Sequence, residues 1–465
     1  MSEQRTWALL REAMRGGTHD FTEGSLDRAI ILLAVPMVME MVMESLFAIV
    51  DVFWVSKLGA DAIAAVGLTE SLLALVYALA MGIAMAATAT VARRVGEKRP
   101  DEAARAAAQA LILGVLFSLP IGLVGVIYAK ELLHAIGGSP AVVAVGTPYF
   151  ALTMASNITI LGLFVINAIF RGAGDAAVAM RVLWFANALN IVLGPLFIFG
   201  IGPFPRLGVT GAAVATTIGR GLGVVVQLFL LFGGRGRIVI RREHFAPDRA
   251  TLATMSGIAA SGTLQSLIGT ASWIGLVRIL SSFGSAALAG YTIGMRLVMF
   301  AILPSWGLSN AAATMVGQNL GADKPERAEA AVHRAGLWNT IVLGIIGMIF
   351  VVFAGPICAP FAPPASNPDV FRYAVSSLRI TSCGFLFYGY GMVFGQAFNG
   401  AGDTWTPTWL NLACFWAFEI PLAWALSKTA LGPSGVFASI AIAFSALTLV
   451  SAVVFRRGGW KTRRV

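Results

Sequence analysis

Residues 29–54 read AIILLAVPMVMEMVMESLFAIVDVFW, an apolar stretch whose charged residues are Glu40, Glu44 and Asp51. An α-helix crosses the hydrocarbon core of a bilayer with about 20 apolar residues, so this stretch predicts a transmembrane helix. Its apolar run is continuous, whereas strands of a membrane barrel alternate apolar and polar residues. At about 100° per residue the three acids share one helix face, and we call them the acid stripe.

The same apolar pattern recurs along the whole chain. Only 12% of the 465 residues are charged and the mean hydropathy is +0.80, whereas roughly 25% are charged in soluble domains. We therefore expect an all-α integral membrane protein with twelve transmembrane helices in the lipid bilayer. Their approximate ranges are 29–54, 62–91, 106–128, 143–169, 178–201, 209–232, 251–280, 286–316, 332–354, 371–397, 407–427 and 433–455.

The placement of the positive charges indicates a membrane topology and argues against a nucleic-acid partner. The formal net charge is +10, but most of the 33 lysines and arginines lie in alternate connections between the apolar segments. When the N-terminus is placed in the cytoplasm, these basic connections are cytoplasmic, which is the positive-inside pattern. We expect a multi-pass protein of the cell (inner) membrane with both termini cytoplasmic.

The chain contains an internal duplication. VSKLGADAIAAVG (55–67) aligns with LSSFGSAALAGYT (280–292), and IFRGAGDAAVAM (169–180) aligns with AFNGAGDTWTPT (397–408). Each half has six expected helices, so the repeats are parallel, an arrangement typical of transporters with two bundles around a central site. The expected parts are a cytoplasmic N-terminal segment (1–28), an N-lobe (29–232), a cytoplasmic linker (233–250), a C-lobe (251–455) and a basic cytoplasmic tail (456–465).

The two GAGD segments, 172–175 and 400–403, raise the question of phosphate binding. Glycines allow backbone amides to approach an anion, but neither segment carries the lysine of a P-loop. Both segments lie at equivalent ends of expected helices. We therefore predict tight turns that close those helices, and no ATP-driven motor.

The paired motifs, together with VDVFWVSKLGADAIAAVGL and NIVLGPLFIFGIGPFPRLGVTGAAVAT, resemble the multidrug and toxic compound extrusion (MATE) family from about residue 25 to 455. The resemblance implies two six-helix lobes that form a V-shaped central cavity. It also implies secondary active export of amphipathic, often cationic compounds in exchange for H⁺ or Na⁺ by alternating access. Asp51 matches the family's coupling acid near the outer end of the first helix.

The resemblance also shows a departure in the fifth helix. One subgroup of the family carries an Asn and, four residues later, an Asp; here the positions are Asn190 and Gly194. The acids that another subgroup uses in the seventh, eighth and tenth helices are missing from the corresponding segments. We therefore expect the coupling site in the N-lobe, at Asp51, Glu44, Glu40, Asn190, Asn187 and Glu70, with Asp51 and Asn190 as the candidates for holding Na⁺.

The acid stripe has a physical cost that limits its roles. An ionised carboxylate at bilayer depth costs about 2.5–3.5 kcal/mol on insertion scales, so it must face water, pair or bind a proton. Glu40 and Glu44 are an i,i+4 pair of like charges, which suggests that they share protons. Hydrogen bonding to a neighbouring helix is the structural alternative for each. Glu419, on the expected eleventh helix, is a further acid with either a functional or a structural role.

A cavity for many substrates needs adaptable apolar contacts and few fixed hydrogen bonds, which methionine and aromatic side chains supply. The candidates for binding small organic substrates are Met39, Met43, Phe47, Tyr77, Gln265, Trp273, Trp306, Tyr388 and Gln396. Packing and contact with lipid are the alternatives for each of them. We expect a monomer with no cofactor other than the coupling ion.

The sequence also bears on three functions other than export: a flippase, a membrane enzyme and a channel. A flippase for lipid-linked saccharides would use arginines to hold a pyrophosphate, and the C-lobe offers Arg278, Arg296 and Arg379. A membrane enzyme would need a nucleophile or a metal cluster, but the four histidines lie in or beside loops without metal-ligand spacing. A channel would need a continuous pore, and duplicated lobes with one acid stripe favour a gated site. We therefore expect a transporter and not an enzyme.

Overall fold

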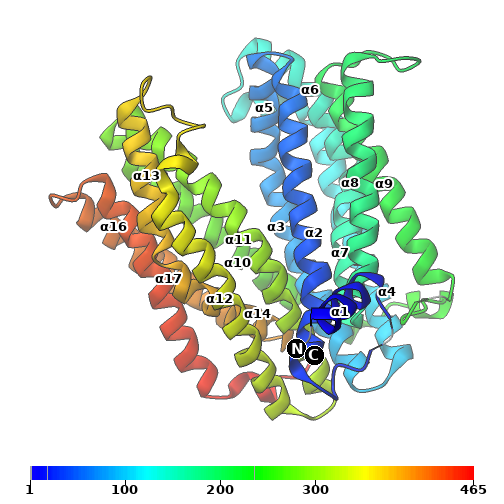
Figure 1. Ribbon diagram of the computed structural model, residues 1–465. Helices are drawn as coiled ribbons and strands as arrows, with labels where there is room; N and C mark the ends of the chain where they lie inside the picture. Colours follow the sequence, from blue (N-terminus) through cyan, green and yellow to red (C-terminus); the bar gives the residue numbers. More distant parts are fainter. Residues whose placement is uncertain (1–2, 18, 235) are drawn as a thin grey trace. The chain divides into compact units, whose positions relative to one another are not determined.

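The computed structural model describes residues 3–17, 19–234 and 236–465, and all regular elements in this part are helices (Figure 1). The elements of the first half are α1 (Glu3–Arg15), α2 (Leu26–Ser56), α3 (Ala60–Gly96), α4 (Pro100–Ile127), α5 (Ala129–Ala135), α6 (Pro140–Ala155), α7 (Asn157–Ala173), α8 (Ala176–Phe199), α9 (Val209–Phe232) and the 3₁₀ helix η1 (Arg242–Phe245).

The elements of the second half are α10 (Arg249–Leu280), the 3₁₀ helix η2 (Ser281–Phe283), α11 (Ser285–Gly321), α12 (Pro325–Cys358), α13 (Pro368–Ser382), α14 (Phe385–Gly400), α15 (Trp405–Asn411), the π-helix η3 (Leu412–Glu419), α16 (Ile420–Ser427), α17 (Pro433–Arg456) and the 3₁₀ helix η4 (Gly459–Thr462). This confirms the predicted all-α fold.

The number of membrane crossings comes close to the expected twelve. In the described residues, ten helices are long and apolar enough to cross a membrane, and α6 with α7 makes an eleventh span bent by 43°. The expected span 371–397 is instead divided between α13 and α14, which have 15 and 16 residues. Each is shorter than the roughly 20 residues that a crossing needs, so only the two helices together cover this span.

The described chain divides into two compact units. Unit 1 comprises the described residues within 1–20 and 39–263, together with Val465, and unit 2 comprises Phe21–Val38 and Leu264–Arg464. The division differs from the expected lobes in that the first part of α2 belongs to unit 2 and the first part of α10 to unit 1. The V-shaped arrangement of the lobes stays a prediction.

The duplication in the sequence is also a duplication of backbone conformation. Helices α3 and α11 both have 37 residues, and each follows a glycine with positive φ, 100° at Gly59 and 93° at Gly284. After each helix a non-glycine residue has positive φ, 57° at Lys98 and 55° at Asp323. These conformations are rare for side-chain-bearing residues, so their recurrence at the same offset shows a repeated turn.

The helices also pack in the same pairs within each unit. In unit 1, α3 packs against α4 and α7, while α8 and α9 run side by side (Figure 1). In unit 2, α11 packs against α12 and α14, and α16 packs against α17. Fully buried alanines such as Ala87, Ala107 and Ala168 allow the helices of unit 1 to approach closely.

The two GAGD segments form the predicted turns. Gly174 and Gly402 are left-handed, with φ of 85° and 82°. The amide of Asp175 donates to the carbonyl of Phe170 (2.8 Å), and the amide of Asp403 donates to that of Phe398 (2.9 Å). These bonds capture free carbonyls at the ends of α7 and α14, which is a helix-capping role.

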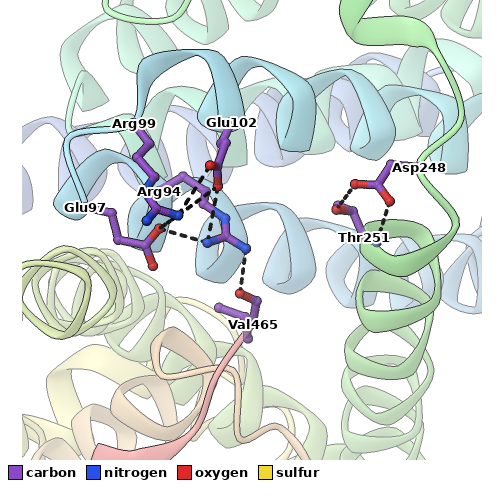
Figure 2. A network of polar contacts seen from close by, with 7 residues as sticks. All are labelled: Arg94, Glu97, Arg99, Glu102, Asp248, Thr251 and Val465. Atoms are coloured by element: carbon purple, nitrogen blue, oxygen red, sulfur yellow. Dashed lines mark hydrogen bonds and ion pairs between the residues drawn. The ribbon is translucent and has the colours of Figure 1, made fainter.

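Charged side chains gather at the turn between α3 and α4 (Figure 2). The Nη1 atom of Arg94 lies 2.8 Å from Oε2 of Glu97, and its Nη2 donates to the carbonyl of Val465 (3.0 Å). Arg99 and Glu102 form a further pair at 3.3 Å. Such partly exposed pairs contribute about 0–1 kcal/mol each.

Asp248, also seen in Figure 2, caps the first turn of α10. Its Oδ1 accepts from the amides of Ala250 (3.1 Å) and Thr251 (3.4 Å), and its Oδ2 accepts from the hydroxyl of Thr251 (2.7 Å). The hydrogen bond from the Thr251 side chain, helped by these amides, lowers the pKa of Asp248 below its usual value.

We predict that Asp248→Ala lowers the free energy of unfolding by about 1 kcal/mol, the usual cost of losing such a cap, and that Asp248→Asn costs much less. Because the pKa of Asp248 is lowered on folding, the charged cap stabilises the protein at neutral pH. This contribution is lost as the pH falls through that lowered value. Unfolding of purified protein in detergent at several pH values measures both effects; equal losses for Ala and Asn would refute the cap.

Candidate functional site

The first acid of the stripe, Glu40 on α2, is buried in an ion pair. Its side chain is 2% exposed, and its Oε1 lies 2.9 Å from Nη1 of Arg171 on α7. The same oxygen accepts from Nδ2 of Asn167 (3.1 Å), one turn earlier on α7. Gln227 on α9 in turn donates to the Oδ1 of Asn167. The charge of Glu40 is therefore compensated by a cation and held by a chain of buried amides.

The second acid, Glu44, has its own arginine. Its Oε1 lies 3.6 Å from Nη2 of Arg220 on α9, and its Oε2 accepts from Nδ2 of Asn187 on α8 (3.0 Å). Arg220 also donates from Nη1 to the hydroxyl of Tyr77 on α3 (3.2 Å). Each of the two acids that were expected to share protons therefore has an arginine of its own, and the sharing stays a prediction.

The third acid, Asp51, is placed differently. It is half-buried, and it forms neither an ion pair nor a side-chain hydrogen bond with any residue that the structure describes. Its main electrostatic neighbours are Glu70 on α3 and Arg220 on α9. Asp51 is about 16 Å of helix rise beyond Glu40. Of the three stripe acids, it alone has no guanidinium within ion-pair distance in the described chain.

The predicted amide partners lie beside the stripe but do not contact Asp51. Asn187 and Asn190 are both buried on α8. Asn187 donates to Glu44, and Asn190 donates from Nδ2 to the hydroxyl of Thr216 on α9 (2.7 Å). A Cβ added at Gly194 would meet only the Trp54 ring, at 3.9 Å, so a Cβ atom fits at this buried position without a clash.

The predicted substrate contacts divide between the two units, and their role stays a prediction. In unit 1, Met43 and Phe47 are buried at 9% exposure, and the carbonyl of Met39 accepts from Nε1 of Trp184 (3.0 Å). The Arg220 guanidinium lies 5.8 Å from the Phe47 ring and 6.0 Å from the Tyr77 ring. The unit 1 candidates are Met39, Met43, Phe47 and Tyr77; those in unit 2 are Gln265, Trp273, Trp306, Tyr388 and Gln396.

Sequence reasoning missed Asn167, Arg171 and Arg220 as partners of the stripe. Arg171 lies near the end of α7, and its side chain pairs with Glu40. A signal was available: Asn167 and Arg171 are four residues apart and so lie on one face of α7. Asn187 of the predicted set does contact the stripe through Glu44, while its role in coupling stays a prediction.

We predict that breaking the buried Glu40–Arg171 pair destabilises the protein. Arg171→Met leaves a buried carboxylate without its cation, and Glu40→Gln leaves a buried guanidinium without its anion, so each costs about 3–5 kcal/mol. The double variant restores neutrality and recovers most of this loss. Unfolding of the four proteins in detergent forms a double-mutant cycle.

The exposed pair Arg372–Asp369, with both side chains about two-thirds exposed, is the matched control. Arg372→Met removes the same number of atoms and costs less than about 1 kcal/mol because solvent screens the pair. A cost for Arg171→Met no larger than that of the control would show that the buried pair is not needed for stability.

Comparison with known proteins identifies the family. The MatE family model matches residues 36–196 and 258–425, which is most of the chain. The chain belongs to the MATE family. The match extends across both units, and it confirms the resemblance drawn from the paired motifs.

Several MATE relatives match nearly the full length of the chain. A probable multidrug resistance protein, YoeA of Bacillus subtilis, is 24% identical over 96% of this chain and 97% of its own. A protein named FAD transporter from Shewanella oneidensis is 24% identical over 91% of this chain and 93% of its own. A solved transporter of the MOP superfamily from Pyrococcus furiosus, whose binding pocket is described as having reverse polarity, has a TM-score of 0.89 at 25% identity, covering 95% of this chain and 98% of its own.

These matches show a MATE transporter with relatives in multidrug efflux, and a multi-pass membrane protein. A transporter family is consistent with the expectation that the chain is not an enzyme. The paired acids and the unpaired Asp51 can therefore be considered as parts of a transport cycle.

Proposed function

We propose that this MATE protein is a secondary active exporter of amphipathic, cationic organic compounds, driven by exchange for H⁺ or, as the second choice, Na⁺. It acts as a monomer in the cell membrane with both termini cytoplasmic. The multidrug names of several relatives support export of organic compounds. The coupling ion and the charge of the substrate are inferred from the charges of unit 1, and the orientation is inferred from the placement of the basic residues along the sequence.

The observation that carries the proposal is the contrast between Asp51 and the other two stripe acids. Glu40 and Glu44 are compensated by Arg171 and Arg220, so their charges are fixed by partners. Asp51 has no such partner among the described residues and can alternate between carboxylate and carboxylic acid. An acid that is ionised in one conformation and protonated in the other couples H⁺ to the conformational change.

The charge balance of unit 1 favours a cationic substrate. Arg171 and Arg220 are paired with Glu40 and Glu44, so these positive charges are already balanced. An ionised Asp51, which has no ion-pair partner among the described residues, attracts a cation, and a protonated Asp51 does not. A proton and a cationic drug would then compete for Asp51, which is the requirement for exchange.

Export of an anionic compound is the second candidate, because one relative is named FAD transporter. A dinucleotide or a lipid-linked pyrophosphate needs uncompensated cations. Arg171 and Arg220 are already paired with acids, whereas Arg278, Arg296 and Arg379 in unit 2 are exposed and form no ion pair with described residues. The pairing in unit 1 supports the cation exporter, and the three unit 2 arginines without an acidic partner are the observation that keeps the anion exporter or flippase as the second candidate.

We predict that Asp51→Asn abolishes pH-driven efflux of a fluorescent organic cation from proteoliposomes, because the amide cannot exchange a proton. Asp61→Asn on α3 is the matched control, since Asp61 is exposed, and it should leave the efflux rate unchanged. Repeating the assay with a Na⁺ gradient separates the two ions. Undiminished pH-driven efflux by Asp51→Asn would overturn the assignment of Asp51.

We further predict that Gly194→Asp raises the number of protons exchanged per substrate. A Cβ fits at Gly194 without a clash, and its neighbour Trp54 lies one helical turn from Asp51, so the new acid would stand near the coupling acid. Gly194→Asn adds the same volume without the charge and should leave the ratio unchanged. The number of protons per substrate is measured from the pH gradient at which a given substrate gradient produces no net transport. An unaltered number in Gly194→Asp would mean that this position is not a coupling site.

A further inference from the structure

Unit 2 contains one buried acid that the transport scheme above does not use. Glu419 is the last residue of the π-helix η3, and its side chain is 3% exposed. It forms no ion pair with any residue in the described part of the chain. A π-helical turn inside a longer helix is rare and is frequently found at functional sites.

The surroundings of Glu419 offer no compensating charge. The titratable groups that act on it or are influenced by it are Tyr291 on α11, Tyr388 on α14 and Cys414 on η3. All three are neutral in their ordinary state. Tyr291 is fully buried, and its ring stacks on the ring of Phe437 with 6.0 Å between the two ring centroids. An ionised Glu419 would therefore be an isolated charge in an apolar core, which is strongly unfavourable.

The contacts of the Ser272 hydroxyl group on α10 favour a proton on the carboxyl group of Glu419. The Ser272 hydroxyl oxygen lies 3.0 Å from the carbonyl oxygen of Phe415 and 3.2 Å from Oε2 of Glu419. A carbonyl oxygen only accepts, and a hydroxyl group has a single proton to donate. When Ser272 donates to Phe415, its contact with Glu419 is a hydrogen bond only if the carboxyl group is protonated and donates.

Helix α10 holds this segment at neighbouring points. Trp416 of η3 donates from Nε1 to the carbonyl of Ile268 (3.1 Å), one turn before Ser272. A Cβ at Gly275 would meet the Ile420 side chain at 3.0 Å, so α10 and α16 approach closely there. The packing of α10 against η3 and α16 therefore sets the distance between Ser272 and Glu419.

We propose that Glu419 and Ser272 form a second proton-binding site, within unit 2, which holds one proton in this conformation and exchanges it with water during the transport cycle. The site has the groups that a proton carrier needs. The carboxyl group of Glu419 binds the proton, the hydroxyl group of Ser272 forms a hydrogen bond with it, and no paired cation holds the carboxyl group in its ionised form. Its part in transport rests on the proposed function, but the binding of the proton does not.

Infrared spectroscopy of the purified protein in detergent tests the site directly. A protonated carboxyl group has a distinct C=O stretching band, which shifts when the protein is transferred to D₂O. We expect Glu419→Gln to remove one such band at neutral pH. Ser272→Ala should keep the band and shift its frequency, because the carboxyl group loses its hydrogen-bond partner.

Asp369→Asn is the control, since Asp369 is exposed and paired with Arg372, and it should leave this band unaltered. A band that persists in Glu419→Gln would overturn the proposal, and an unshifted band in Ser272→Ala would remove Ser272 from the site.

Proton counting in proteoliposomes then tests the role in transport. We expect Glu419→Gln to exchange one proton fewer per cycle and Asp51→Asn to lose pH-driven transport altogether. Unchanged transport by Asp51→Asn would refute the proposed function while leaving the infrared assignment of Glu419 intact. An unchanged proton count for Glu419→Gln would overturn its exchange during transport.

Discussion

A carboxylate inside an apolar helix must be paired, solvated or protonated, and the polar interior of unit 1 is arranged around this requirement. The acid stripe of α2 is met by Asn167 and Arg171 from α7, Asn187 from α8 and Arg220 from α9. Each contact needs a particular side chain at a particular height along its helix, so the polar contacts of the stripe favour one register of α7, α8 and α9 against α2.

The duplication repeats the backbone of the fold but not its polar chemistry. The positive φ angles at Gly59 and Gly284 and the equal lengths of α3 and α11 recur because the turns and the apolar helices must satisfy the same backbone geometry in both halves. The buried acids are under no such constraint. Unit 1 compensates Glu40 and Glu44 with arginines, whereas unit 2 keeps Glu419 beside a hydroxyl group. The same scaffold therefore carries two different ways of burying an acid.

The sequence was sufficient to predict those features of the fold that depend on local patterns. Apolar runs, the repeated motifs and the two GAGD turns were predicted correctly because each depends on residues close together in the chain. The division of 371–397 into α13 and α14 was missed, since the break at Cys383 and Gly384 contains no proline. The prediction of the site was incomplete for the opposite reason: Arg171 lies 131 residues from Glu40, and an i,i+4 rule considers only one helix.

The partners of the buried acids also determine which of them can carry a proton through a cycle. Protonating Glu40 would leave the guanidinium of Arg171 buried without an anion, a penalty of several kcal/mol that opposes the exchange. The same argument applies to Glu44 and Arg220, although Glu44 is one-third exposed and the penalty is smaller. Asp51 and Glu419 can change charge without leaving a buried guanidinium without its anion. Fixed ion pairs thus restrict proton exchange to the acids without a paired arginine, which gives a physical reason for both kinds of acid in one transporter.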